Sequence, residues 1–299
     1  MKNEVIDLLK NEEKLSNKTI NEGEFAELVK EIGKQETSYI KDSEITKDLT
    51  TQYIGRNLYI YNEVSSTNTI AKFLSENDVE NGSVVICEKQ NAGKGRSGKF
   101  WESPLGGIWL SIILKPDVDY SKLPIITLAT GVAVAKALKK IGIENPEIKW
   151  PNDIIINDRK ICGILTESVS KLNNIESVII GVGIDANIDV NQLPEELQNT
   201  TTTIKEELGK SIDENHLIKI FFEEFEEIIE IFNQNRYEEI LKEWRKRSYS
   251  IGKIVEVRKP FNNYYDAYVL GISKEGALVV ERNDGSLEKV FSGECQIKK

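Results

Sequence analysis

Five short apolar runs rich in Val and Ile dominate the middle of the chain, and they constrain its fold more than any other feature. Between and after them lie two longer stretches, residues 125–142 and 211–232, in which apolar residues recur at helical spacing. The five runs occupy residues 82–90, 106–116, 147–157, 159–169 and 176–187. Runs of this length bounded by turn residues are typical of β-strands. We therefore predict an α/β or α+β core in which helices flank a β-sheet.

The two ends of the chain differ from this middle part in their charge and in their hydrophobic pattern. Residues 1–45 are strongly charged and hold two short helical patterns, VIDLL and FAELVKEI. Residues 252–293 indicate four or five short strands with turns at KEG and NDG, which suits a small β-barrel. We predict three parts: a charged helical segment over 1–45, a core domain over 46–248 and a small barrel over 249–299.

Length and cysteine content indicate a soluble intracellular protein. The 299 residues can hold about two domains. No apolar run reaches the ~20 residues that a bilayer span needs, and the acidic, amphipathic start does not resemble a signal peptide. Cys87, Cys162 and Cys295 are scattered without C-x-x-C spacing, so neither a disulfide framework nor a zinc site is predicted. We expect a cytoplasmic protein without a membrane partner.

The charge balance argues against a protein that binds nucleic acid through its whole surface. The net charge is −10, and the first 50 residues hold eight Lys, no Arg and twelve Asp or Glu. A DNA-reading helix needs a basic face, which this segment lacks. DNA is therefore not an expected partner, and any anion site must be a local basic island.

His216 is the only histidine in the chain, which excludes a multi-histidine metal site. It lies in an amphipathic helical pattern with Asp213 as the expected N-cap, so a surface position is favoured over a catalytic one. The chemistry must come from Lys, Arg, Asp, Asn and backbone groups. No residue is assigned as a metal ligand.

The loop QNAGKGRSGKFWESPLGG begins at Gln90 and imitates a P-loop. From Gly93 it reads G-x-x-x-x-G-K, but Phe100 stands where a Mg²⁺-binding hydroxyl belongs, and a turn with another strand follows in place of a helix. A P-loop is therefore set aside. The segment from Lys89 to Lys99 carries four cations and three glycines without an acidic residue, so it can close over an anion, although a solvated basic loop fits the same residues. The four cations are Lys89, Lys94, Arg96 and Lys99.

A second glycine motif, GVGIDA from Gly181 to Ala186, matches a dinucleotide fingerprint only weakly. The residues that follow it do not form a helical pattern, so no helix N-terminus faces a pyrophosphate. Glycines at the end of a core strand are more typical of close backbone approach.

Five ordered motifs, from about residue 45 to the end, resemble those of biotin protein ligases. The motifs are the basic loop, Ser65-Ser66-Thr67-Asn68, the segment Lys149-Trp150-Pro151-Asn152-Asp153 with the turn at Asn157-Asp158 and Arg159-Lys160-x-x-Gly163, the strand GVGIDAN, and Ser292-Gly293-Glu294. The resemblance implies an α+β fold with a mixed β-sheet catalytic domain and flanking helices, as in class II aminoacyl-tRNA synthetases and biotin protein ligases. A small C-terminal SH3-like β-barrel completes it.

The same resemblance implies a reaction. Biotin and MgATP give biotinyl-5′-AMP and pyrophosphate, and the biotinyl group then moves to one lysine of a biotin carboxyl carrier protein. ATP, Mg²⁺ and biotin are the implied ligands. The implied catalytic residues are Lys160, Arg96 and Asp153. The implied biotin-binding residues are Ser66, Thr67, Gln90, Gly93, Lys94, Arg96, Lys160 and Gly163. The implied residues for ATP and the adenylate are Lys94, Arg96, Trp101, Asn152 and Lys160.

Some of these residues have simpler explanations, which stay open. Ser66 or Thr67 can cap a helix that begins TNTIAKFL, and Asp153 can cap the turn after Trp150-Pro151. The sequence also departs from the family pattern, because Lys94 and Lys99 stand where arginine is common, Ser97 replaces an arginine of some members, and Asp185 stands in place of asparagine. A lysine keeps the charge but loses the two-pronged geometry of arginine.

Two alternative functions remain at this stage. One is a ligase that is also a biotin-responsive repressor, which requires the first 45 residues to form a DNA-binding domain. The other is a lipoate or octanoate ligase of the same superfamily, although the motifs follow the biotin branch. The family includes monomers and dimers, and we favour a homodimer.

Overall fold

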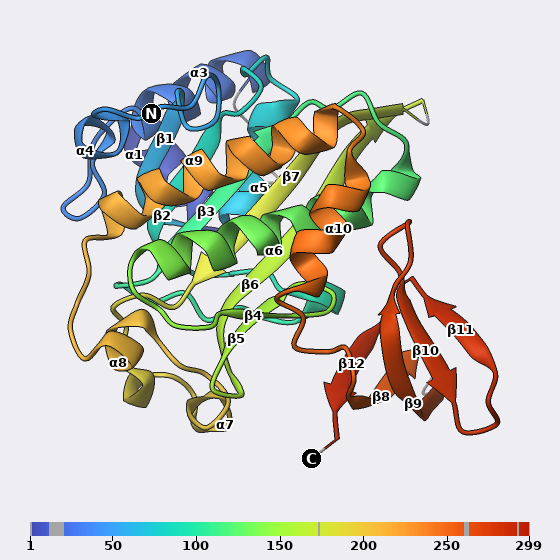
Figure 1. Cartoon of the computed structure of the whole chain (residues 1–299). Helices are drawn as coiled ribbons and strands as arrows, with labels where there is room; N and C mark the ends of the chain where they lie inside the picture. Colours follow the sequence, from blue (N-terminus) through green and yellow to red (C-terminus); the bar gives the residue numbers. More distant parts are fainter. Residues whose placement is uncertain (1, 12–20, 173, 260–262, 292, 299) are drawn as a thin grey trace.

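The computed structural model describes residues 2–11, 21–172, 174–259, 263–291 and 293–298. A seven-stranded sheet forms the centre, in the order β1-β2-β3-β7-β6-β5-β4 (Figure 1). Only β1 and β2 are parallel and the other neighbours are antiparallel, so the sheet is mixed as predicted. Its strands are β1 (Leu58–Val64), β2 (Val84–Gln90), β3 (Ile108–Leu114), β4 (Glu147–Lys149), β5 (Asp153–Ile156), β6 (Arg159–Lys171) and β7 (Asn174–Ile184).

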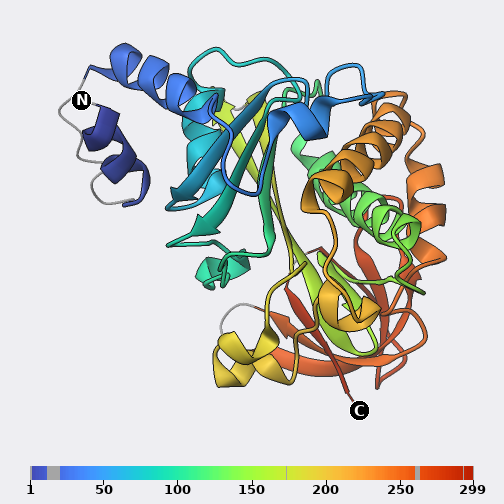
Figure 2. The same cartoon turned by 90° about the vertical axis from the view of Figure 1, so that its left-hand side faces the viewer.

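Helices cover both faces of this sheet (Figure 2). One face carries α6 (Leu123–Lys140), α9 (Glu214–Asn233) and α10 (Tyr237–Arg245), and the other carries α1 (Lys2–Leu9), α3 (Glu22–Gly33) and α5 (Thr67–Ser75). Because both faces are covered, all seven residues of β3 are buried, which explains its unbroken apolar run. Shorter elements connect these layers: α4 (Asp42–Thr46), η1 (Arg96–Gly98), η2 (Tyr120–Lys122), η3 (Val190–Gln192), α7 (Glu195–Gln198) and α8 (Ile204–Leu208).

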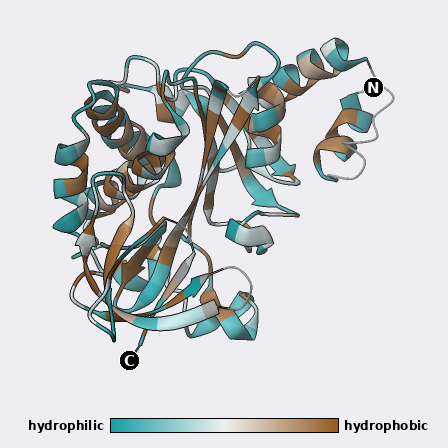
Figure 3. Cartoon of the chain, turned by 90° about the vertical axis from the view of Figure 1, so that its right-hand side faces the viewer, coloured by the Kyte–Doolittle hydropathy of each residue, from teal (hydrophilic) through white to brown (hydrophobic). Residues whose placement is uncertain are grey.

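The two long predicted helices form as α6 and α9. Asp213 caps α9 as expected, because its carboxylate accepts from the backbone N–H groups of Asn215 and His216. The segment containing α6 is apolar and long enough to cross a bilayer by length and composition, but 67% of its apolar window is buried inside the protein. This helix therefore belongs to the core, and Figure 3 shows hydrophobic residues, in brown, along the helices and strands of the molecule.

The N-terminal helices pack onto the sheet. Val5 and Leu9 of α1 and Phe25 and Val29 of α3 are buried in one cluster with residues of β1 and β2. The backbone N–H of Ser65, just after β1, donates to the carbonyl of Leu9 at 2.7 Å. The apolar faces of both helices are thus used in packing against the core.

The C-terminal residues form a five-stranded antiparallel sheet in the order β11-β10-β9-β8-β12. Its strands are β8 (Ile254–Lys259), β9 (Asn263–Ile272), β10 (Leu278–Arg282), β11 (Leu287–Val290) and β12 (Glu294–Ile297). Trp150 joins this sheet domain to the core, since its indole N–H donates to the carbonyl of Gly276 and its backbone N–H to the Ser250 hydroxyl, both at 3.1 Å. Trp150 is 2% exposed, so its side chain is shielded from solvent at this junction.

Candidate active site

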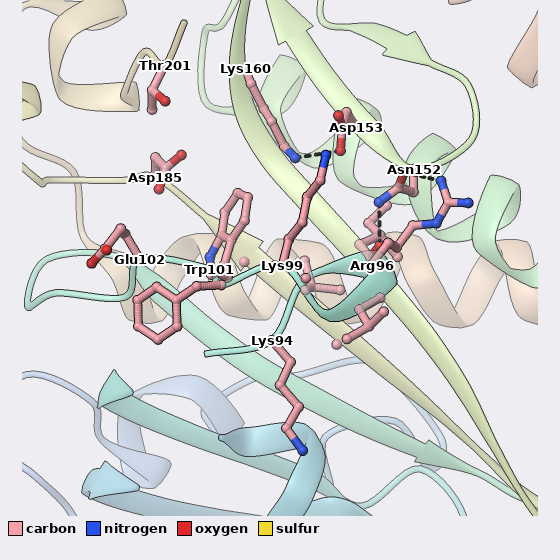
Figure 4. Close-up of a pocket in the computed structure, with 18 of the residues that line it drawn as sticks. Lys94, Arg96, Lys99, Trp101, Glu102, Asn152, Asp153, Lys160, Asp185 and Thr201 are labelled. Carbon is pink, nitrogen blue, oxygen red and sulfur yellow. Dashed lines mark hydrogen bonds and ion pairs between the residues drawn. The ribbon is translucent and has the colours of Figure 1, made fainter. Parts of the chain in front are cut away.

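A cavity of about 460 Å³ lies beside the large sheet, between the loop that follows β2 and the strands β6 and β7 (Figure 4). Most of the residues singled out from the sequence line it, although they come from distant parts of the chain. Cys295 and Gln296 of β12 complete the wall, so the C-terminal domain contributes to the site. The other lining residues are Gln90, Leu110 and residues within 66–68, 94–102, 149–165, 181–185 and 193–201.

Lys160 reaches into this cavity from the start of β6. Its ammonium lies 2.6 Å from a carboxylate oxygen of Asp153 and 4.7 Å from the ring centre of Trp101. Its backbone N–H donates to the carbonyl of Thr200, and its carbonyl accepts from the N–H of Thr202, both at 2.8 Å. The backbone of Lys160 is therefore held by the segment around Thr201, and its cation faces both an anion and an aromatic face.

The turn before Lys160 explains where β6 begins. Asn157 and Asp158 have φ values of 50° and 64°, the left-handed conformation that a tight two-residue hairpin requires. The predicted turn is confirmed. It directs Lys160 toward β5 and therefore toward Asp153, because β5 and β6 are paired across it.

Trp101 lies flat against the strands beneath the loop. A Cβ atom on Gly183 would meet its indole nitrogen at 2.5 Å, and one on Gly163 would meet its ring at 2.9 Å. Both glycines are therefore required for this close approach, as was predicted for the glycine strand. The buried indole N–H of Trp101 lies against Gly183 of β7 and has no hydrogen-bond partner within the described part of the chain.

A row of buried polar side chains lies at the opposite end of the cavity from Lys160. Gln90 accepts from the backbone N–H of Thr67 at 2.8 Å and donates to the hydroxyl of Ser103 at 2.7 Å. Ser66 occupies the N-cap position of α5, but its side chain makes no capping bond. The capping explanation therefore does not account for the Ser66 hydroxyl, which faces the cavity.

Arg96 joins the basic loop to two other parts of the protein. Its guanidinium donates to the side-chain oxygen of Asn152 at 3.1 Å and to the carbonyl of Gly293 at 3.3 Å. Asn152 in turn donates to the carbonyl of Ile164 at 2.8 Å. In this arrangement the loop is anchored at once to the core and to the C-terminal domain.

The remaining loop residues occupy different places. Lys99 points toward Asp153 as Lys160 does, whereas Lys94 points away from both (Figure 4). Gly93 is not among the lining residues. It lies behind the site, where a Cβ atom would meet the carbonyl oxygen of Trp101 at 2.2 Å. Its contribution is close packing and not a side-chain contact.

Asp185 is buried in the wall of the cavity at 4% exposure. Burial raises the pKa of its carboxyl well above the usual range, and the positive charge of Lys160 opposes this only in part. Burial in the cavity wall therefore favours the protonated form of this carboxyl.

Sequence reasoning missed several residues that shape the site. The segment that pins Lys160, around Thr200 and Thr202, carries no motif beyond its run of threonines. Ser111 is a single polar residue inside an apolar strand, and Glu167 lies in the polar run Thr166-Glu167-Ser168 of β6, so neither has a spacing signal. Among the described residues, no group of three or more His, Cys, Asp or Glu side chains is placed to hold a metal ion.

The chain is similar to known proteins over most of its length. Residues 61–185 match the profile of the Biotin/lipoate A/B protein ligase family, and residues 250–298 match that of the Biotin protein ligase C terminal domain. The protein named Bifunctional ligase/repressor BirA of Bacillus subtilis (strain 168) is 34% identical over 271 residues, which are 90% of this chain and 81% of that relative.

Two further relatives agree with these matches. A biotin ligase for acetyl-CoA carboxylase from Mycobacterium tuberculosis is 29% identical over 251 residues, covering 79% of this chain and 89% of that protein. The solved structure of the biotin protein ligase from Aquifex aeolicus in complex with biotin and ATP superimposes with a TM-score of 0.71 and 27% identity. It covers 82% of this chain and 99% of that one.

Proposed function

The chain belongs to the biotin protein ligase family, and on that premise we propose that its cavity activates biotin with ATP and transfers the biotinyl group to a carrier lysine. First, the biotin carboxylate attacks the α-phosphorus of ATP, which gives biotinyl-5′-AMP and releases pyrophosphate. Then a lysine amine attacks the carbonyl of this mixed anhydride, an amide forms and AMP leaves. The observation that carries the proposal is the Lys160 ammonium, held beside Asp153 and over the Trp101 ring inside the cavity.

The first step needs cations, because two anions must approach each other. A positioned cation near the carboxylate and the α-phosphate lowers this repulsion, and a unit pair at ~4 Å is worth ~4 kcal/mol at an effective dielectric of 20. Lys160 fills this role with a backbone whose N–H and carbonyl are both bonded to the segment around Thr201. Lys99 and Arg96, from the loop above, add charge on the other side of the ligand.

Asp153 keeps Lys160 in place before the substrates bind. When the biotin carboxylate and the phosphate arrive, the ammonium turns to them and the Asp153 carboxylate is released. A released carboxylate beside the mixed anhydride can accept the proton that the carrier lysine must lose before it attacks. Asp153 thus acts in both steps, first as a partner of the cation and then as a base.

The two ends of the cavity suit the two halves of biotinyl-5′-AMP. Ser66, Thr67 and Gln90 offer polar groups for the cyclic urea of biotin, next to the apolar strand surface at Gly163. On the other side, the residues that face the adenylate are Trp101, Asn152 and Arg96, and Lys94, which points away from Lys160 and Asp153, must turn to reach it. Enclosure by the loop keeps water from the reactive anhydride.

Magnesium enters as part of MgATP. Asn152 and Asp153 present hard oxygen atoms on one turn, which is the ligand chemistry that Mg²⁺ prefers when it arrives with phosphates. The ion supplies charge neutralisation for the departing pyrophosphate. The carboxylate of Asp153 is available for such contacts only after Lys160 has turned away from it.

The test is biotin-dependent exchange of pyrophosphate into ATP, followed by mass analysis of a biotin carboxyl carrier domain in the same tube. Exchange plus a mass increase of one biotin is expected. Absence of exchange with biotin, together with exchange when lipoate or octanoate is supplied, would move the protein to the sister activity of the same superfamily.

A repressor function, which the name of the Bacillus subtilis relative includes, is not part of the proposal. The reason is that α1 and α3 bury their apolar faces against the core, and the first 50 residues carry a net negative charge. A salt-dependent DNA-binding assay with biotin and ATP checks this. Binding above that of a random-sequence control would restore a regulatory function.

The proposed partner is the carrier domain of a biotin-dependent carboxylase, and the proposed location is the cytoplasm, where such carboxylases are biotinylated. We also propose that the protein forms a homodimer. Sedimentation equilibrium with and without biotinyl-5′-AMP measures it directly.

A further inference from the structure

One row of directly paired residues crosses the large sheet beneath the cavity. The partners in this row, from β3 to β4, are Trp109, Gly183, Gly163, Asp153 and Lys149. Residues directly opposite each other in neighbouring antiparallel strands point to the same face of a sheet. The Lys149 side chain therefore lies on the same face as the Asp153 carboxylate and the two glycines beneath the indole, and it lines the cavity.

The ammonium of Lys149 makes no hydrogen bond or ion pair with any residue that the structure describes. The carboxylate of its strand partner Asp153 is taken by Lys160 at 2.6 Å. Glu147 lies two residues earlier on β4; burial raises the pKa of its carboxyl, and the cation that opposes this rise is Lys253. Lys149 thus places a positive charge at the cavity without a carboxylate of the described chain beside it.

The C-terminal sheet closes the cavity on the side of Lys149. Cys295 of β12 lines the cavity at 4% exposure. Burial raises the pKa of its thiol to about 11, and the positive charges of Lys149 and Arg96 oppose this rise. The thiol is therefore neutral at pH 7, and both cations act on it from nearby. Two positive charges from different elements thus meet at an uncharged part of the wall.

The first step of the proposed reaction releases an anion that the cavity must hold. An oxygen of the biotin carboxylate forms a bond to the α-phosphorus, the bond from that phosphorus to the bridging oxygen breaks, and pyrophosphate leaves with the electron pair. In phosphoryl transfer the attacking and leaving oxygens lie roughly in line with the phosphorus. The leaving pyrophosphate must therefore lie on the side of the α-phosphate opposite to biotin.

The order of the strands places Lys149 on that side. The polar groups proposed above for biotin lie at the ends of β1 and β2, at one end of the strand order, and β4 is the strand at the other end. Lys160 and Asp153 begin β6 and β5, between these ends, and Lys149 is the last residue of β4. Neighbouring strands are about 4.8 Å apart, so Lys149 lies one strand beyond Asp153 as seen from biotin.

We propose that Lys149, together with Arg96, binds the β- and γ-phosphates of ATP and then the pyrophosphate that leaves. The proposal rests on the proposed function and adds a residue that the mechanism above does not use. A fixed cation at this place stabilises the charge that develops on the bridging oxygen as its bond to the α-phosphorus breaks. Because pyrophosphate takes no part in the transfer to the carrier lysine, Lys149 acts in the first step alone.

The first measurement compares two nucleotides by calorimetry at saturating biotin. One is an ATP analogue with a methylene group between the α- and β-phosphorus, which cannot release pyrophosphate, and the other is AMP, which lacks both outer phosphates. For Lys149→Ala we expect the Kd of the analogue to rise roughly 10- to 100-fold, the loss of a contact to a charged group, while the Kd of AMP stays within about twofold. An equal rise for both nucleotides, or none for the analogue, overturns the proposal.

The second measurement separates the two half-reactions. Exchange of pyrophosphate into ATP needs a place for pyrophosphate, whereas transfer from supplied biotinyl-5′-AMP to the carrier lysine does not. In Lys149→Ala the KM for pyrophosphate should rise roughly tenfold or more, while the KM for biotin and the rate of transfer stay within about twofold. A distorted site would slow both half-reactions, so equal losses in exchange and transfer would refute the assignment.

Further variants test whether the charge is responsible. Lys149→Arg keeps the charge and should bind the ATP analogue within about fivefold of wild type, whereas Lys149→Gln keeps a polar side chain without charge and should resemble Lys149→Ala. Wild-type affinity in Lys149→Gln contradicts the proposal. Lys253→Ala is the matched control, since it removes a lysine whose ammonium lies over the Tyr249 ring and which does not line the cavity. It should leave all of these quantities unchanged.

The outcomes also distinguish this inference from the proposed function. If the wild-type protein supports neither exchange nor transfer, the proposed function fails and the inference fails with it. If the wild type does both and Lys149→Ala matches it for the ATP analogue and for pyrophosphate, only the inference fails. Thermal melting of each variant, together with its transfer rate from supplied biotinyl-5′-AMP, confirms that the comparison is between folded proteins.

Discussion

One ammonium group supplies the central charge of the cavity, and its position follows from local structure. Lys160 follows a turn of two left-handed residues, and its backbone is bonded on both sides to the segment around Thr201. A flexible surface lysine would have to be ordered when the substrate binds, and that ordering costs side-chain entropy. Much of this cost is met when the protein folds, because Lys160 is already paired with Asp153.

Replacement of Lys160 by alanine should therefore impair adenylate formation more than binding. With ~4 kcal/mol of charge stabilisation at stake, we expect pyrophosphate exchange to fall by roughly three powers of ten, with a Tm close to that of wild type. Lys139→Ala, which removes an exposed lysine of α6, is the control. Near-normal exchange by Lys160→Ala would refute the assignment.

Arg96 fixes the position of the basic loop, because it links the loop to two different domains. Arg96→Gly removes both hydrogen bonds of the guanidinium, to Asn152 and to the carbonyl of Gly293. We expect adenylation to persist but the intermediate to escape roughly 10- to 100-fold faster, the effect of losing hydrogen bonds to a charged group. The measurement is the rate at which free biotinyl-5′-AMP accumulates.

Two companion variants sharpen that experiment. Arg96→Lys keeps the charge without the two-pronged geometry and should leak at an intermediate rate. Lys89→Ala removes a nearby cation that pairs with Glu63 and does not line the cavity, so it should retain the intermediate as wild type does. Equal retention by Arg96→Gly and wild type would remove the argument for loop closure.

The packing of α6 against α9 contains a buried charge whose effect depends on pH. Burial works to raise the pKa of Glu224, but Lys136 and Lys140, each 2.5 Å away, outweigh it and leave the pKa lowered. A carboxyl whose pKa is lower in the folded state stabilises the fold above the unfolded value of about 4.3, and this contribution is lost as pH falls through the folded pKa.

Urea unfolding at several pH values measures this contribution. Glu224→Gln should lower the free energy of unfolding by about 1–2 kcal/mol at pH 7, and the difference from wild type should shrink below pH 4. A difference that stays constant with pH would mean that packing, and not the charge, is responsible.

The sequence predicted the helices and strands better than it predicted the distant residues that hold the site residues in place. The five apolar runs correspond to strands of the large sheet, but the run over 147–157 splits into β4 and β5, because Trp150 turns inward to join the domains and Pro151 has no N–H to donate. β1 was not predicted, since its LYIYNEV lies outside those runs. The site motifs were found because they are contiguous in sequence.

What could not be predicted at the site depends on contacts between distant residues. Lys160 and Asp153 are seven positions apart and were both named, whereas their neighbour Thr200 is forty positions from Lys160 and was not. Glu167 is similar, because its carboxylate reaches Asn68 only when β6 lies beside α5. Spacing rules describe one element at a time and contain no such information.

At the scale of the whole molecule, Trp150 is the link between the catalytic core and the C-terminal sheet. Trp150→Phe keeps the aromatic packing and removes the hydrogen bond to the carbonyl of Gly276, which remains buried without its partner. We expect a loss of about 1–3 kcal/mol in the free energy of unfolding. Calorimetry should also show a broader transition, because the two domains no longer melt together.

A matched change elsewhere controls for the substitution itself. Tyr39 is 62% exposed, and Tyr39→Phe removes one polar group from an aromatic side chain at the surface. Its Tm should equal that of wild type. If Trp150→Phe were equally stable, the domains would be held by their remaining contacts alone.

The docking of α1 also sets the order in which the chain can finish folding. The helix is made first, yet the cluster that buries Val5 and Leu9 includes Ile179 of β7, which is synthesised 170 residues after Leu9. At ~5–20 residues per second a ribosome needs roughly 10–35 s to reach it. Eight residues do not hold a helix alone in water, so α1 must wait, exposed, for packing partners that are translated after it.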